Sequence, residues 1–129
     1  MIRLKVQTRY KSQMVDITSE VTEAVIKRGI KRGIATLFLP HSTAGLVIFE
    51  NSDISLRREF LNTLNSLLIP KEYLHQNAPA HLKSAFLKNS LTFIVEEGQI
   101  LLGNWQNIFL VELDGPRERT LLIKVIGGG

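Results

Sequence analysis

The chain has 129 residues, which fits one domain with a core large enough to fold without disulfides or metals. It contains no cysteine, and this excludes a disulfide framework, a thiolate zinc site and a cysteine nucleophile. The net charge of +4 permits attraction to phosphates, but a few surplus lysines on a solvated surface give the same total, so the charge does not favour a nucleic acid as partner.

The N-terminal residues alternate apolar and polar side chains over residues 2–10, which predicts a strand with one wet face. This segment lacks the apolar core of a signal peptide, and no later run approaches a membrane span, so we expect a cytoplasmic protein. A short second strand is predicted over residues 14–17. Thr18 or Ser19 would then cap a helix that ends at Gly29.

A polar bend between two apolar segments, residues 37–39 and 46–49, has the composition of a site. The two segments are predicted to be strands of one hairpin. Their connection carries His41, Ser42 and Thr43, where a surface turn more often has Asn-Gly or Asp-Gly. An imidazole and two hydroxyls at such a bend favour a functional site over an ordinary turn.

Two helices are predicted in the middle of the chain. Apolar residues at helical spacing indicate an amphipathic helix over residues 53–68, with Asn51 or Ser52 as its N-cap. Pro79 favours a short helix that starts near residue 78 and has His81 in its first turn. Because a helix N-terminus disfavours imidazolium, we expect His81 to be neutral.

From Leu91 onward the sequence is typical of three or four antiparallel strands joined by glycine turns, which predicts a meander. With the earlier strands this makes about seven strands beside three helices. We therefore predict an α+β fold for a single domain over residues 1–129, with a largely antiparallel β-sandwich or sheet and about three helices packed against it.

Two sets of residues are candidates for function. The first contains all three histidines, His41, His75 and His81, which lie in predicted loops or helix starts and could together form a catalytic or metal-binding cluster. The second would bind an anion through the helix start at Asn51 and the guanidinium of Arg117 on a turn. Each set also has a structural interpretation, as surface histidines, helix capping and ordinary turn chemistry.

Four segments resemble, in order and spacing, those of the YjbQ-type family of small proteins, some members of which are described as secondary thiamine-phosphate synthases. They are HSTAGL, ENSD, AHLKSAFL and GNWQNIFLVELDGPR. The resemblance covers nearly the whole chain. It implies a compact α+β unit with a sandwich-like sheet arrangement, usually a homotrimer with sites near the subunit boundaries.

The resemblance also implies roles for particular residues. The catalytic set would be His41, His75, His81 and Asp53, and the three histidines would be the ligands of a divalent, zinc-like cation. The ligand-binding set would be Ser42, Thr43, Glu50, Asn51, Gln106 and Arg117.

Three functions are open at this point. The first is a weak thiamine-phosphate synthase, which joins a pyrimidine diphosphate to a thiazole phosphate. The second is a non-catalytic binding protein for a phosphorylated metabolite. The third, least favoured, is an RNA-associated basic protein, which would show steep salt dependence of binding.

Overall fold

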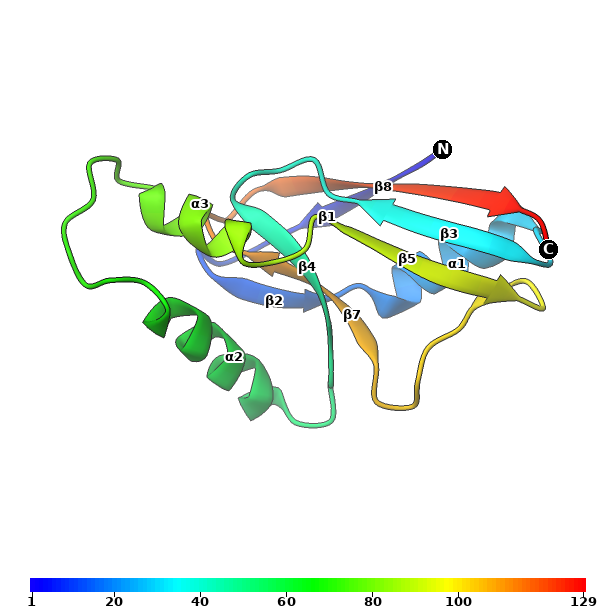
Figure 1. Cartoon of the computed structure of the whole chain (residues 1–129), viewed down its shortest axis with the longest axis horizontal. Helices are drawn as coiled ribbons and strands as arrows, with labels where there is room; N and C mark the ends of the chain where they lie inside the picture. Colours follow the sequence, from blue (N-terminus) through cyan, green and yellow to red (C-terminus); the bar gives the residue numbers. More distant parts are fainter.

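The computed structural model of the protein describes all 129 residues. It contains eight strands and three helices, and it confirms the predicted α+β class (Figure 1). In chain order the elements are β1 (Ile2–Gln7), β2 (Gln13–Asp16), α1 (Thr18–Arg28), β3 (Gly33–Phe38), β4 (Ala44–Phe49), α2 (Ile54–Ser66), α3 (Ala78–Ala85), β5 (Ser90–Glu96), β6 (Gln99–Ile100), β7 (Asn107–Glu112) and β8 (Glu118–Gly127).

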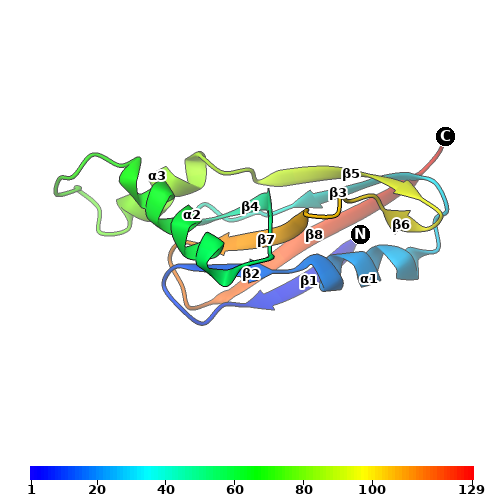
Figure 2. The ribbon, with the colours of Figure 1, turned by 90° about the horizontal axis from the view of Figure 1, so that it is seen from below.

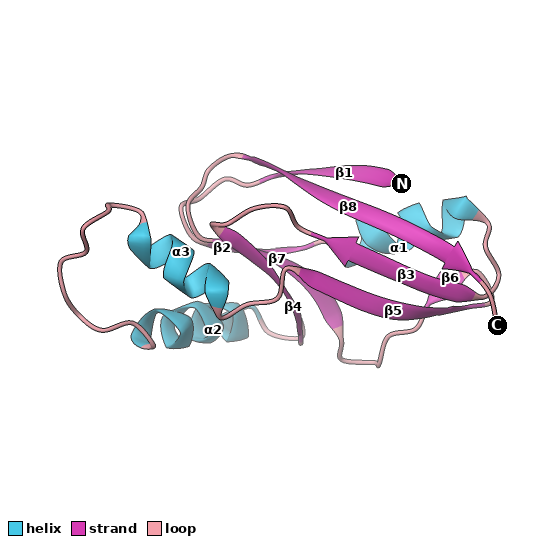
Figure 3. Ribbon diagram, turned by 45° about the horizontal axis from the view of Figure 1, so that its top comes forward, coloured by secondary structure: helices cyan, strands magenta, loops and turns pink.

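The strands form two antiparallel sheets (Figure 3). One has five strands in the order β1-β8-β3-β5-β6, and the other has three in the order β2-β7-β4. The main core lies between them and includes Leu37 and Ile123 from the larger sheet and Leu46 and Leu110 from the smaller one. Val21 of α1 is part of the same core, so α1 packs against the main core.

Strand β7 is buried on both faces because the smaller sheet is covered on both sides. Its Ile108 and Leu110 face the main core, whereas Phe109 and Val111 belong to a second core with Leu64 of α2. Helices α2 and α3 lie together at one end of the molecule, far from the C-terminus (Figures 1 and 2). None of the three helices has the length and apolar character that crossing a bilayer demands.

The outer face of the larger sheet carries an exposed apolar row. Ile34 pairs in register with Ile94 on one side and Ile126 on the other, and all three side chains are exposed. A row of this kind is what neighbouring copies of a chain often cover. The homotrimer implied by the family resemblance stays a prediction.

Two predicted strand connections are wrong. β3 pairs with β5 and β8 in the larger sheet, and β4 pairs with β7 in the smaller one, so the polar bend of residues 39–43 crosses between sheets and closes no hairpin. The C-terminal strands also form no meander, because only β5 and β6 are paired neighbours. Alternation along a strand identifies the strand without identifying its partner, which explains both errors.

The predicted helix caps also need correction. Asp53 caps α2, and its Oδ1 accepts a hydrogen bond from the Ser55 backbone N–H at 2.9 Å, so neither Asn51 nor Ser52 has that role. Ile17 is the N-cap of α1 and no side chain caps this helix, so neither Thr18 nor Ser19 has that role; the Thr18 hydroxyl donates to Asp16 and accepts from the Ile108 backbone N–H. Gly29 ends α1 in the left-handed conformation, as predicted.

Candidate functional site

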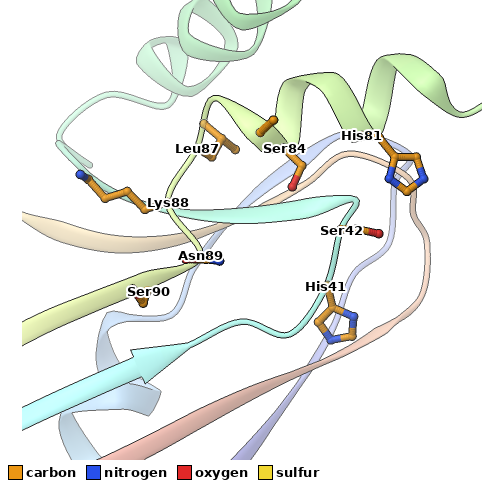
Figure 4. A pocket seen from close by; sticks show the side chains of 9 residues that line it. His41, Ser42, His81, Ser84, Leu87, Lys88, Asn89 and Ser90 are labelled. Carbon is orange, nitrogen blue, oxygen red and sulfur yellow. The ribbon is translucent and has the colours of Figure 1, made fainter.

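A pocket of about 660 Å³ opens between the bend after β3 and helix α3 (Figure 4). This volume is in the range of small-metabolite sites. No acidic side chain lines the pocket, and only two of its nine lining residues are hydrophobic. The lining residues are His41, Ser42, His81, Ser84, Ala85, Leu87, Lys88, Asn89 and Ser90.

The imidazole of His41 is held by the neighbouring strand β8. Its Nε2 accepts a hydrogen bond from the Thr120 backbone N–H at 3.0 Å. A nitrogen that accepts a hydrogen bond carries no proton, so the neutral ring carries its proton on Nδ1. His41 therefore has a free N–H donor on the side of the ring away from Thr120.

The surroundings of His41 keep the ring neutral. Burial lowers the pKa of His41 below its ordinary value of 6.5, and the positive charge of Arg119 lowers it further. Arg117 acts in the same direction. The pocket thus presents an uncharged imidazole as a hydrogen-bond donor.

A buried ion pair beneath His41 links the two sheets. Arg119 of β8 donates from Nε to Glu112 Oε1 of β7 at 2.8 Å, and its terminal nitrogen contacts the other carboxylate oxygen. The same nitrogen donates to the backbone oxygen and the hydroxyl of Thr43, at 3.0 and 2.9 Å. Both charged side chains are almost fully buried. Since Thr120 follows Arg119, this pair fixes the strand that holds the His41 ring.

Glu112 is ionised in spite of its burial. Burial alone would raise the pKa of Glu112, but hydrogen bonds from Arg119, Thr8 and the Asp114 backbone N–H outweigh it and lower the pKa below 4.5. The Thr8 hydroxyl lies 2.8 Å from Glu112 Oε1. Every buried side-chain polar atom of the molecule has a hydrogen-bond partner.

The other two histidines differ in position. His81, in the first turn of α3, lines the pocket, with its Nε2 3.1 Å from Asn77 Nδ2. His75 lies exposed in the loop before α3 and does not line the pocket. Figure 4 shows Ser42 between the two imidazoles, with Lys88 extending away from them.

A single chain does not provide the donor set of the predicted zinc-like site. The single chain gathers no group of three or more His, Asp or Glu side chains that could hold a metal ion. His41 Nε2 is also occupied by the Thr120 N–H, and a zinc ligand needs a free lone pair. One chain does not fit the three-histidine site, so a cation would need ligands from a second copy; the prediction concerned the trimer and stays a prediction.

Glu50, Asn51 and Asp53 lie beyond the other end of β4, away from the pocket. A six-residue strand separates them from the bend, a span of roughly 20 Å. The Asn51 amide donates to Asp16 Oδ2 at 2.5 Å, and its oxygen accepts from Arg57 Nε at 3.1 Å. Asp53 caps α2, and the Ser55 backbone N–H lowers the pKa of its carboxyl. Within one chain Asn51 and Asp53 have structural contacts.

Gln106 and Arg117 are engaged in local turns. Gln106 Oε1 accepts from the Gly103 N–H at 2.7 Å. Arg117 donates from Nε to the Asp114 backbone oxygen at 3.0 Å and forms an ion pair with its carboxylate at 3.1 Å. Their proposed contacts with a ligand stay predictions, as does that of Thr43, whose oxygens both accept from Arg119.

Sequence reasoning missed the residues that support His41. Arg119 begins an alternating face continued by Leu121 and Ile123, and an arginine on an apolar face needs a buried partner. Glu112 likewise ends the apolar run of β7. The two charged residues on apolar strands can be recognised in the sequence, but the sequence does not show that they pair with each other across the sheets.

Comparison with known proteins identifies the family. The model of the family described as UPF0047 protein YjbQ-like matches residues 2–128. The chain belongs to the YjbQ-like family. A UPF0047 protein of Methanocaldococcus jannaschii is 40% identical, over 98% of this chain and 94% of that protein. The YugU protein of Bacillus subtilis is 38% identical, over 96% and 97%.

Solved structures of YjbQ-like proteins have the same fold. An uncharacterised family member from Clostridium acetobutylicum superposes with a TM-score of 0.91 at 38% identity, covering 98% of this chain and all of that one. A protein of unknown function from Sulfolobus solfataricus also gives 0.91, at 39% identity, covering 98% and 96%. The YjbQ resemblance inferred from the four segments is confirmed.

Proposed function

We propose that the protein binds the phosphate group of a small metabolite in the pocket between His41 and His81. The observation that supports this most is the hydrogen bond from Thr120 N–H to His41 Nε2. It leaves Nδ1–H as a donor on a ring that Thr120 holds in place, and an N–H donor of fixed orientation suits an oxyanion.

The rest of the lining suits the same ligand. The Ser42 hydroxyl and the Asn89 amide add uncharged donors, and no carboxylate repels an anion. Arg117 and Arg119 lie close enough to lower the pKa of His41, but each is paired with a carboxylate, so the neutral donors of the lining would make the contacts with the phosphate. The Ser84 hydroxyl, by contrast, is engaged with the Ala44 backbone oxygen at 2.7 Å.

A thiamine-phosphate synthase activity is the narrower form of this proposal, suggested by the family resemblance. In that reaction the thiazole nitrogen forms a bond to the pyrimidine methylene carbon, and the bond from that carbon to diphosphate breaks. The leaving diphosphate gains negative charge, which the N–H of His41 would stabilise. Binding without turnover would leave the protein as a metabolite-binding protein.

Calorimetric titration with a thiazole phosphate tests the proposal. In His41→Gln the amide oxygen can take the place of Nε2 and keep the acceptor for Thr120, but the donor at Nδ1 is lost. We expect the affinity to fall about tenfold or more, the scale of a lost hydrogen bond to a charged group. Turnover is then measured by adding the pyrimidine diphosphate.

His75→Gln is the matched control, because it makes the same substitution at an exposed residue outside the pocket. Its affinity should equal that of the wild type. Equal affinities for all three proteins, or equal losses in both variants, would refute the proposed site.

A further inference from the structure

A second cavity lies on the opposite side of α3, between helix α2 and the segment around β2. Its volume is about 560 Å³, and it shares no lining residue with the His41 pocket. Figure 2 shows α2 alongside β2 at this end of the molecule. Three cations line the cavity, Arg57, Arg58 and Lys83, and no acidic side chain does.

Lys83 lacks a charged partner. Its Nζ donates only to Asn65 Oδ1, at a long 3.4 Å. Burial lowers the pKa of Lys83, and repulsion from Lys11 lowers it further. The carboxylate of Asp114 forms ion pairs with Lys11 and Arg117, and none of the ion pairs of the molecule includes Lys83. A partly buried ammonium without an anion is destabilising, and a bound anion would relieve this.

Arg57 is held by contacts with Phe109 and Asn51 and also lacks a direct carboxylate partner. Its guanidinium lies 5.0 Å from the centre of the Phe109 ring, and its Nε donates to Asn51 Oδ1 at 3.1 Å. The Asn51 amide is in turn held by Asp16. An amide oxygen orients a guanidinium without neutralising it, so the charge is positioned and still available to a ligand.

The floor of the cavity is apolar. Met14, Leu64 and Leu113 line it and belong to the second core, and Leu61 packs against that core. The Tyr10 and Ser12 hydroxyls and the Asn62 amide add neutral polar groups. Cations at the edge over an apolar floor suit a molecule with an anionic head and an apolar body.

We propose that this cavity is a second ligand site, which binds an organic phosphate with its phosphate group at Lys83 and its apolar or aromatic part on Met14, Leu61 and Leu64, while Arg57 and Arg58 add positive charge near the start of α2. The site does not depend on the His41 pocket. The proposal of this second site can therefore be tested separately from the function proposed for the His41 pocket.

The test uses phenyl phosphate as the probe, with backbone amide NMR shifts to locate it on the full chain. We expect shifts at Gln13, Asn62 and Lys83, with an affinity that falls about ten- to a hundredfold in Lys83→Met, the scale of a charge-assisted hydrogen bond. His41→Gln should leave these shifts unchanged. Inorganic phosphate should bind more weakly than phenyl phosphate, because it lacks the apolar part.

Lys27→Met is the control for charge alone, since Lys27 lies in the last turn of α1 and outside this cavity. It should keep the wild-type affinity. The thermal midpoint of Lys83→Met should not fall, because the substitution removes an unpaired cation and keeps an apolar side chain of similar length.

Four results would overturn the proposal. One is the absence of shifts at these amides at millimolar phenyl phosphate, and another is an unchanged affinity in Lys83→Met. The third is equal binding of inorganic phosphate. The fourth is occupation of the cavity by a second copy of the chain, seen as concentration-dependent shifts at the same amides without any probe.

Discussion

The two cavities use positive charge in opposite ways. Beneath the His41 pocket, Arg119 is fully buried and meets the carboxylate of Glu112 and both oxygens of Thr43. In the second cavity, Lys83 meets only an amide oxygen at 3.4 Å. The first charge joins two sheets and positions a histidine, whereas the second is left available for a ligand. Burial together with a complete set of partners therefore distinguishes a structural charge from a binding charge.

Removal of Arg119 should have the largest effect on stability. Arg119→Met leaves Glu112 as a buried carboxylate without its cation, so we expect a loss of about 3 to 5 kcal/mol in the free energy of unfolding. Urea unfolding followed by circular dichroism measures it. A loss below about 1 kcal/mol would show that water or other groups replace the guanidinium.

The matching control removes both charges. Glu112→Leu combined with Arg119→Met should cost less than Arg119→Met alone, because no uncompensated charge stays buried. If the double variant is less stable than either single variant, the pair stabilises the fold by direct attraction instead.

Protonation of Glu112 at low pH should reduce the free energy of unfolding by a smaller amount than removal of Arg119. The folded pKa of Glu112 lies below its ordinary value of 4.5, so its contribution to stability is complete above that pH and is lost as pH falls through the folded pKa. The slope from this group is at most about 1.4 kcal/mol per pH unit. Chemical unfolding of the wild type and Glu112→Gln between pH 7 and 3 measures it, and their difference should narrow below pH 4.5. A constant difference would exclude Glu112 as the source.

Substitution of Arg117 should change stability least. Arg117 lies two residues before Arg119 in sequence, but its side chain is 48% exposed and its ion pair with Asp114 spans only three residues. Arg117→Lys should change the free energy of unfolding by less than about 1 kcal/mol, since exposed pairs are screened by water. Thermal unfolding beside Arg119→Met is the measurement, and comparable losses in both would contradict the argument.

Local pattern was enough to predict most elements and the residue types of the site. Alternation identified β1, Pro79 marked the start of α3, and Gly29 marked the end of α1. His41 was identified because it lies in a bend where Asn-Gly or Asp-Gly is more usual, and His81 because it falls in the first turn of a predicted helix. These signals act between neighbours in sequence, so the sequence by itself carries them.

Tertiary structure alone decided how these parts meet. The proton of His41 sits on Nδ1 because of Thr120, which is 79 positions away, and Arg119 meets Thr43 from 76 positions away. β3 and β4 belong to different sheets, although their sequences are also compatible with a hairpin. Strand pairing depends on which distant faces bury the most apolar surface together, and no spacing within a single segment records that choice.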